Sequence, residues 1–203
     1  MYENVLPLLG RLGCFEYLLI LSPHADLQER IGKIKEAFAK EYKAPSAKSK
    51  GHLTLVKFLA SGLTEEKLVN RLQHIAMAAV PFKIELAGFG AFPSHTIFIN
   101  VTTKLPVQNL VREIKQAQGL MRAHKDFKPH FIDEPHLTIA RKLKPWQFES
   151  GWLAYSHAHF TGRFIADAML LLKRSLNGGN YQVVRRFEFQ NLPVATKQGS
   201  LFI

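Results

Sequence analysis

Apolar residues recur along this chain with two periods in turn, one typical of strands and one typical of helices. The short apolar run at 15–21 predicts a strand. A helix is predicted directly after it, because apolar residues lie about one turn apart on a single face: Leu27, Ile31, Ile34 and Phe38. A polar loop then leads to a second predicted strand at 52–59.

A second helix is predicted after that strand, with Thr64 at its N-cap and Pro81 beyond its end. Its apolar face repeats the helical spacing at Leu68, Leu72, Ile75 and Ala79. Residues 82–89 then alternate between apolar and polar side chains, as a half-buried strand does. The first half of the chain therefore reads strand, helix, strand, helix, strand.

The same order of elements returns in the second half. The predicted elements are a strand at 97–101, a helix that opens at Pro106, a strand at 136–140, a short helix from Pro145 and a strand at 159–165. Strands at 169–173 and 181–189 close the chain. Residues 177–180 between them predict a hairpin turn, because neither a Lys-Ser/Thr pair nor a helix follows, as a phosphate-binding glycine loop would require.

This repetition predicts an α+β fold of two related lobes. The interval from His52 to His136, called here the motif offset, is nearly the same as the interval between the neighbouring strands and helices of the two halves. We expect an N-terminal extension at 1–14 and one bilobed domain at 15–203. Within that domain we expect repeated halves at about 15–90 and 95–166, and closing strands at about 168–190.

Composition narrows the class of partner. The 27 Lys and Arg residues against 16 Asp and Glu give a formal charge of +11, which favours an anionic partner such as nucleic acid or nucleotide. Cys14 is the only cysteine, so neither a disulfide framework nor a thiolate zinc site is expected, and a cytoplasmic location is the natural interpretation. No stretch reaches the roughly 20 apolar residues that span a bilayer, so no membrane association is expected.

The candidate chemistry lies in two matching tetrapeptides, His52-Leu-Thr-Leu and His136-Leu-Thr-Ile. Alternate side chains of a strand share a face, so each histidine and its threonine, Thr54 or Thr138, point the same way while the apolar residues point into the core. Attack on a cyclic phosphodiester needs a base and an acid, and histidine serves as either near neutral pH. The threonine hydroxyls can stabilise charge on the phosphate, so neither a metal nor a cofactor is needed.

Two other histidines offer a competing interpretation. His157 and His159 would share one face of a strand and could form a metal-binding pair. Because no Asp, Glu or Cys lies near them in the sequence, a structural role is favoured and no metal site is predicted.

The motif pattern resembles the 2H phosphoesterase superfamily, in which His-x-Thr/Ser-x-apolar occurs twice. Over about residues 15–189 the chain is most similar to the RNA 2′,3′-cyclic phosphodiesterases, also called 2′-5′ RNA ligases. The resemblance implies two mainly antiparallel sheets that flank a central cleft, with helices outside. It also marks three further residues as candidates for substrate binding: Phe58 after the first motif, Arg141 after the second and Tyr181 in the terminal strand pair.

The resemblance implies a definite activity. A 2′,3′-cyclic phosphate at an RNA or nucleotide end would be opened to a 2′-phosphate, with His52 as proton donor and His136 as acceptor. Thr54 and Thr138 would bind the phosphate, and Arg141 could add a fork-shaped contact. Reversible 2′-5′ ligation of RNA would be a further activity, and we expect a monomer.

Alternatives within and outside this class stay open. His130 follows a Phe-x-Pro of the kind that precedes the second histidine in the family, but it lacks a threonine two residues later, so His136 is the candidate. Substrates that need the same two imidazoles are 2′-5′ oligonucleotides and ADP-ribose cyclic phosphate. A non-catalytic module that binds phosphorylated RNA ends would keep the basic surface without needing both histidines.

Overall fold

The computed structural model describes residues 9–10, 13–124 and 126–192. Of the expected N-terminal extension, only residues 9–10 and 13–14 fall within this range, so the division at residue 14 stays a prediction. In the described part of the chain, no helix is long and apolar enough to cross a membrane.

The predicted elements are confirmed, with small changes at their ends. In the described chain they are, in order, β1 (Cys14–Leu21), α2 (Ala25–Glu41), β2 (Leu53–Ser61), α3 (Glu65–Ala78), β3 (Phe82–Phe92), β4 (Thr96–Val101), α4 (Lys104–Ile114), β5 (His130–Phe131), β6 (His136–Arg141), α5 (Pro145–Tyr155), β7 (Thr161–Ala166), β8 (Ala168–Ser175) and β9 (Gln182–Glu188). Short 3-10 turns lie at Pro45–Lys48, Gly62–Thr64 and Lys115–Leu120.

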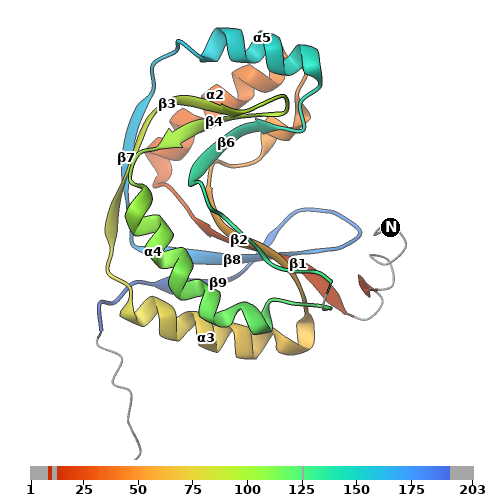
Figure 1. Ribbon diagram of the computed structural model, residues 1–203, viewed down its shortest axis with the longest axis vertical. Coiled ribbons are helices and arrows are strands. Elements are labelled where there is room, and N and C mark those ends of the chain that lie inside the picture. Colours follow the sequence, from red (N-terminus) through yellow and green to blue (C-terminus); the bar gives the residue numbers. More distant parts are fainter. Residues whose placement is uncertain (1–8, 11–12, 125, 193–203) are drawn as a thin grey trace, which may run out of the picture.

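The strands form one antiparallel sheet. The order is β7-β3-β4-β6-β2-β1-β8-β9, with β5 beside β2. Two halves of four strands meet where β2 pairs with β6, and that contact consists of one residue pair, Leu53 with Leu137. The expected α+β fold with two antiparallel sheets is therefore confirmed, as two halves of a single sheet joined at this pair (Figure 1). By position in the sheet, β1 corresponds to β4 and β2 to β6.

The helices interlock the two halves. Helix α2 follows β1 in the chain, yet it packs on β6 and β7 of the opposite half, and α4 follows β4 but contacts β2 and α3. Figure 1 shows α2 and α5 over the upper half and α3 and α4 over the lower half. Each half therefore buries its apolar face under a helix that the other half supplies, so neither half has a complete core alone.

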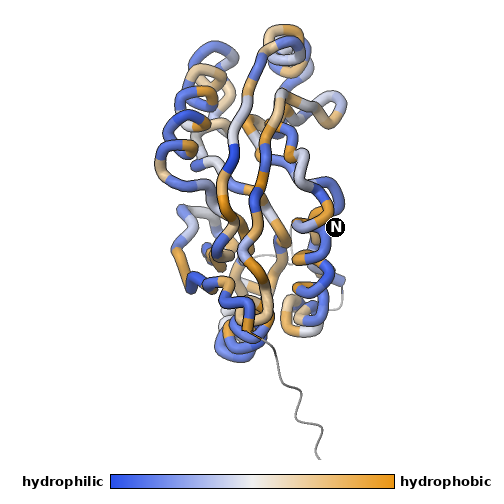
Figure 2. Tube along the Cα trace, turned by 90° about the vertical axis from the view of Figure 1, so that its left-hand side faces the viewer, coloured by the Kyte–Doolittle hydropathy of each residue, from blue (hydrophilic) through white to orange (hydrophobic). Residues whose placement is uncertain are grey.

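The helices show the expected alternation of apolar and polar positions, which Figure 2 shows as orange and blue along each coil. In α2 one buried position departs from the pattern. Leu27, Ile31 and Phe38 are buried as predicted, but Ile34 is only partly buried and Lys35 takes the fourth place inside. A charged side chain in the core calls for polar partners.

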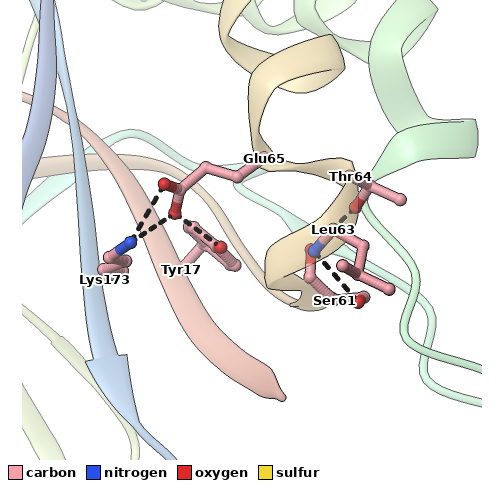
Figure 3. Close-up of polar contacts among 6 residues, drawn as sticks. All are labelled: Tyr17, Ser61, Leu63, Thr64, Glu65 and Lys173. Carbon is pink, nitrogen blue, oxygen red and sulfur yellow. Dashed lines mark hydrogen bonds and ion pairs between the residues drawn. The ribbon is translucent and has the colours of Figure 1, made fainter. Parts of the chain in front are cut away.

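The start of α3 differs from the expectation for Thr64. The residue lies at the N-cap position, but its hydroxyl donates to the carbonyl of Ser61 at 2.9 Å instead of accepting from the helix (Figure 3). The 3-10 turn before α3 already holds Thr64 in helical backbone geometry, so its side chain cannot fold back as a cap. Ser61 caps the turn instead, by accepting from Leu63 N at 3.2 Å. Glu65 bonds the Tyr17 hydroxyl at 2.8 Å and so ties α3 to the sheet.

The hairpin at the end of the chain is confirmed. Strands β8 and β9 pair antiparallel, and Gly178 and Gly179 between them have φ of +98° and +99°. Glycine adopts this left-handed region at little cost, which explains the two adjacent glycines. The turn carries Tyr181 to the edge of the sheet, across from Arg174 of β8.

Candidate active site

The two motifs meet at the centre of the sheet. Leu53 pairs with Leu137 in antiparallel register, which sets His52 across from Thr138 and His136 across from Thr54. All four side chains share one face, because each lies one position away from a buried leucine of the pair. The structure therefore brings together the four candidates that sequence analysis placed on separate strands.

Both motif strands carry a β-bulge directly after the threonine. The β1–β2 register passes from Val56 to Thr54 and skips Leu55, and the β4–β6 register passes from Ala140 to Thr138 and skips Ile139. Leu55 and Ile139 are separated by the motif offset, so the bulges occupy equivalent positions. A bulge reverses the alternation of faces beyond it.

This reversal explains where Phe58 goes. Without a bulge, Phe58 would share a face with His52 and Thr54. Beyond Leu55 the parity changes, so Phe58 is 3% exposed and stacks on Tyr17 with ring centroids 5.2 Å apart, in the core. The structure does not bring Phe58 to the other site residues, and we assign it no contact with substrate.

The same reversal brings two cations to the motif face. Lys57 follows Thr54 at the same spacing as Arg141 follows Thr138, so the two cations lie at equivalent places in β2 and β6. Sequence analysis identified Arg141 but missed Lys57. The motif offset, counted back from Arg141, was the signal that could have found it.

A carboxylate holds the first of these cations. Glu16 Oε2 lies 3.0 Å from Lys57 Nζ, Glu16 Oε1 lies 2.6 Å from Arg174 Nη2, and the Tyr181 hydroxyl donates to the same carboxylate. Burial raises the pKa of Glu16, but the hydrogen bonds from Tyr181 and Lys57 and the charges of Lys57 and Arg174 outweigh it, so the pKa lies below its ordinary value. Glu16 is therefore an anion that orders this side of the site.

Tyr181 lies at the rim of the same cluster. The guanidinium of Arg174 lies 4.7 Å from the centre of its ring. Burial and the bond to Glu16 raise the pKa of its phenol, while the charges of Arg174 and Arg141 act in the opposite direction. The charge of Arg141 lowers the pKa of both Tyr181 and His52, so this cation lies near the rim and near the first histidine.

Both candidate histidines are held in the same tautomer. His52 Nδ1 lies 2.9 Å from the carbonyl of Lys50, and His136 Nδ1 lies 2.8 Å from the carbonyl of Glu134. A carbonyl oxygen can only accept, so each Nδ1 carries a proton and the neutral ring keeps its lone pair on Nε2. Nε2 is thus the atom through which each ring can give or take a proton.

The surroundings lower the pKa of both rings. For His52, burial is the main cause, and the charges of Lys35, Arg141 and His136 add to it against the carbonyl of Lys50. For His136, burial is again the main cause, and the carbonyl and charge of Glu134 oppose it while His130 adds to it. The free site therefore favours neutral rings at neutral pH, and a phosphate between them would favour the protonated form.

The environment of His136 is the more aromatic of the two. Its ring lies 4.9 Å from that of Phe92, edge to face, and 5.0 Å from that of Phe98. In the sheet, Phe98 pairs with Thr138 as Ile20 pairs with Thr54, so the position equivalent to Phe98 in the other half holds an aliphatic residue. The two half-sites thus share a backbone arrangement but differ in the side chains beside the histidine.

Sequence analysis also missed Lys35. From α2 its Nζ donates to the carbonyl of Thr138 at 2.8 Å and to that of Ile139 at 2.9 Å. The side chain is 3% exposed, and burial, with the charge of Arg141, lowers the pKa of Lys35 to about 8. Only its place on the helix face next to Ile31 could have indicated burial.

The strand expected at 159–165 begins only at Thr161, so His157 and His159 lie in the preceding segment and do not share a strand face. Across the described ranges, no three or more His, Cys, Asp and Glu residues gather in a way that could hold a metal ion.

The fold and its duplicated order are those of the 2H phosphoesterases. A family model described as the 2′-5′ RNA ligase superfamily matches residues 23–178. The chain belongs to the 2′-5′ RNA ligase superfamily, which confirms the expected family and places the protein among phosphoesterases. No curated protein matches the chain in sequence.

Solved structures share the fold at low identity. E. coli LigT in apo form is 16% identical with a TM-score of 0.64, over 87% of this chain and 98% of that one. E. coli LigT complexed with 3′-AMP is 17% identical with the same TM-score and coverage. A structure described as a phosphoesterase is 15% identical with a TM-score of 0.59, over 86% of this chain and 98% of that one.

Proposed function

We propose that this protein is a metal-independent phosphodiesterase that opens 2′,3′-cyclic phosphates at RNA or nucleotide ends to 2′-phosphates. The observation that carries the proposal is the antiparallel register at Leu53 and Leu137, which sets each motif histidine across from the other motif's threonine. A phosphate over this pair has an imidazole and a hydroxyl on either side. The 3′-AMP in the LigT complex supports a nucleotide as the ligand class.

The proposed reaction is an in-line displacement at phosphorus. Nε2 of His136 takes a proton from water, and the water oxygen forms a bond to phosphorus. The bond from phosphorus to O3′ breaks, and protonated His52 gives its proton to O3′. The products are a 2′-phosphate and a free 3′-hydroxyl. We assign donor and acceptor as the family does.

The remaining side chains would act on charge. Thr54 and Thr138 would donate to the non-bridging oxygens, where negative charge grows in the transition state. Arg141 would supply a guanidinium that can bind two phosphate oxygens at once. Tyr181 would contact the nucleotide from the rim. If the 5′-hydroxyl of a second RNA replaced water as the nucleophile, the same displacement would form a bond from O5′ to phosphorus, break the bond to O3′ and give a 2′-5′ linkage. In the reverse of that step, the 3′-hydroxyl would attack the linkage and release the 5′-hydroxyl.

The test is incubation of the protein with EDTA and either a nucleoside 2′,3′-cyclic phosphate or a short RNA that ends in one. We expect a 2′-phosphate product, identified by ³¹P NMR, and its loss in His52→Ala and His136→Ala. His95→Ala is a matched control, because His95 makes the same bond from Nδ1 to a carbonyl two residues earlier, at 3.0 Å, outside either motif.

Other outcomes would change the proposal. Tight binding without turnover would favour a module that binds phosphorylated RNA ends. Cleavage of 2′-5′ oligonucleotides or of ADP-ribose cyclic phosphate, with no action on the 2′,3′-cyclic ends, would keep the two-histidine chemistry and replace the substrate. Activity that EDTA abolishes and zinc restores would overturn the metal-independent mechanism.

A further inference from the structure

Lys35 is a buried charge that the proposed reaction does not use. Transfer of an ammonium group out of water is costly unless it gains strong partners. In the described chain the ammonium group of Lys35 donates hydrogen bonds to two carbonyls, those of Thr138 and Ile139, both in the second motif. Because its desolvation is costly and it lies directly beneath the candidate site, we expect Lys35 to have a role in that site.

The bulge explains why this lysine is needed. Ile139 is the residue that the β4–β6 register skips, so its strand lacks a ladder partner at this point. Lys35 supplies donors to the carbonyls there. The equivalent bulge in β2 is satisfied differently, because the carbonyl of Leu55 accepts from Ile132 N at 3.0 Å. One half-site therefore has a cation behind its bulge, and the other has a neutral amide.

We infer that Lys35 is a positioning residue for the phosphodiesterase reaction, which fixes the bulge that orients Thr138 and places a positive charge near His52. The inference rests on the proposed function, because it concerns the same site. Lys35 comes from α2, which follows the strand paired with the first motif, yet packs under the second motif. Lys35 thus bonds the backbone of the second motif, while its charge acts on His52 of the first motif.

The electrostatic part acts on one histidine only. The groups that face His52 are Lys35 of α2, Arg141 and His136 of β6, and the carbonyl of Lys50, and the first three lower its pKa together with burial. The groups that act on His136 are its neighbour Glu134 and His130, without Lys35. Loss of the Lys35 charge should therefore raise the pKa of His52 and leave that of His136 in place.

The variants separate the charge from the hydrogen bonds. Lys35→Met removes both, and Lys35→Gln removes the charge while it keeps an amide donor. Lys33→Met is the matched control, because Lys33 lies on the same helix and pairs with Glu29 in solvent. NMR titration of the imidazole Cε1–Hε1 signals, assigned with His52→Gln and His136→Gln, measures each pKa without any substrate.

We expect the pKa of His52 to rise in both Lys35 variants and to stay in place in Lys33→Met. The limb of the pH profile that reports His52 should move to higher pH by the same amount. The kcat of Lys35→Met should fall roughly tenfold or more, by analogy with the loss that follows removal of a side chain that orients a metal ligand. Lys35→Gln should recover part of this loss, because its amide can still bond the bulge.

A measurement on the unchanged protein covers the case in which the variants do not fold. The His52 signal should show a second inflection near pH 8, where Lys35 itself loses its proton. Absence of that inflection, or an unchanged His52 pKa in folded Lys35→Met, would overturn the inference. Lack of turnover by the wild-type protein would instead sink the proposed function, and the titration would still decide the role of Lys35.

Discussion

The half-site around His52 and the half-site around His136 share one backbone and differ in what surrounds it. Both have the motif, the Nδ1 bond to a carbonyl two residues earlier, and a bulge after the threonine. Their surroundings diverge, because the cation after the first motif is held by Glu16 whereas the second motif has Lys35 beneath it and two phenylalanines beside it. Symmetric chemistry can thus acquire a direction from unsymmetric neighbours.

The largest test of the comparison removes the histidines themselves. His52→Ala and His136→Ala should each lower kcat by about 100-fold or more, the usual scale for a positioned acid or base. The double variant should be hardly worse than either single one, because the pair acts as a unit. Steady-state rates on a 2′,3′-cyclic nucleotide measure this. If the two single losses multiplied in the double variant, independent roles would replace the facing pair.

The next test compares the equivalent cations. Arg141→Met should lower kcat/KM by about 10- to 100-fold, the range that corresponds to loss of one hydrogen bond to a charged group. Lys57→Met should cost less, because Glu16 already holds Lys57 in the free protein. The same assay measures both variants at one ionic strength. Equal losses would show that the carboxylate does not distinguish the half-sites.

The carboxylate offers a finer variation of this comparison. Glu16→Gln removes the anion but can still bond the Tyr181 hydroxyl, so it should release Lys57 toward the motif face. We expect KM for the cyclic nucleotide to fall a few-fold, because an additional cation then faces the phosphate. Lys57→Met in the Glu16→Gln background is the control, and it should abolish the gain. An unchanged KM would mean that Lys57 does not reach the substrate.

The elements and both motifs could be predicted because hydrophobic periods and a duplicated tetrapeptide can be recognised in the sequence alone. The sequence could not predict the bulges, since a skipped residue such as Leu55 leaves no mark in an apolar run. The burial of Phe58 in the core follows from this bulge and could not be predicted from the strand period. The burial of Lys35 depends on a strand from the other half of the chain, so α2 alone could not reveal it. Lys57 was within reach, because it repeats Arg141 at the motif offset.

The smallest expected effect is on the pH dependence of the free energy of unfolding. His52 and His136 have lower pKa values in the folded protein than the ordinary value of about 6.5. As pH falls below that value, the unfolded chain takes up these protons first, so the free energy of unfolding decreases until pH passes below the folded pKa values. Above about pH 8 both rings are neutral in either state, and their contribution to the slope vanishes.

Urea denaturation at a series of pH values between about 5 and 8 would measure this slope. In the His52→Gln, His136→Gln double variant the slope should be smaller, because glutamine does not titrate. Lys35→Met should remove only part of it, through His52 alone. A double variant with the full wild-type slope would mean that groups other than His52 and His136 cause the acid sensitivity. The two histidines would then not lower the free energy of unfolding in acid.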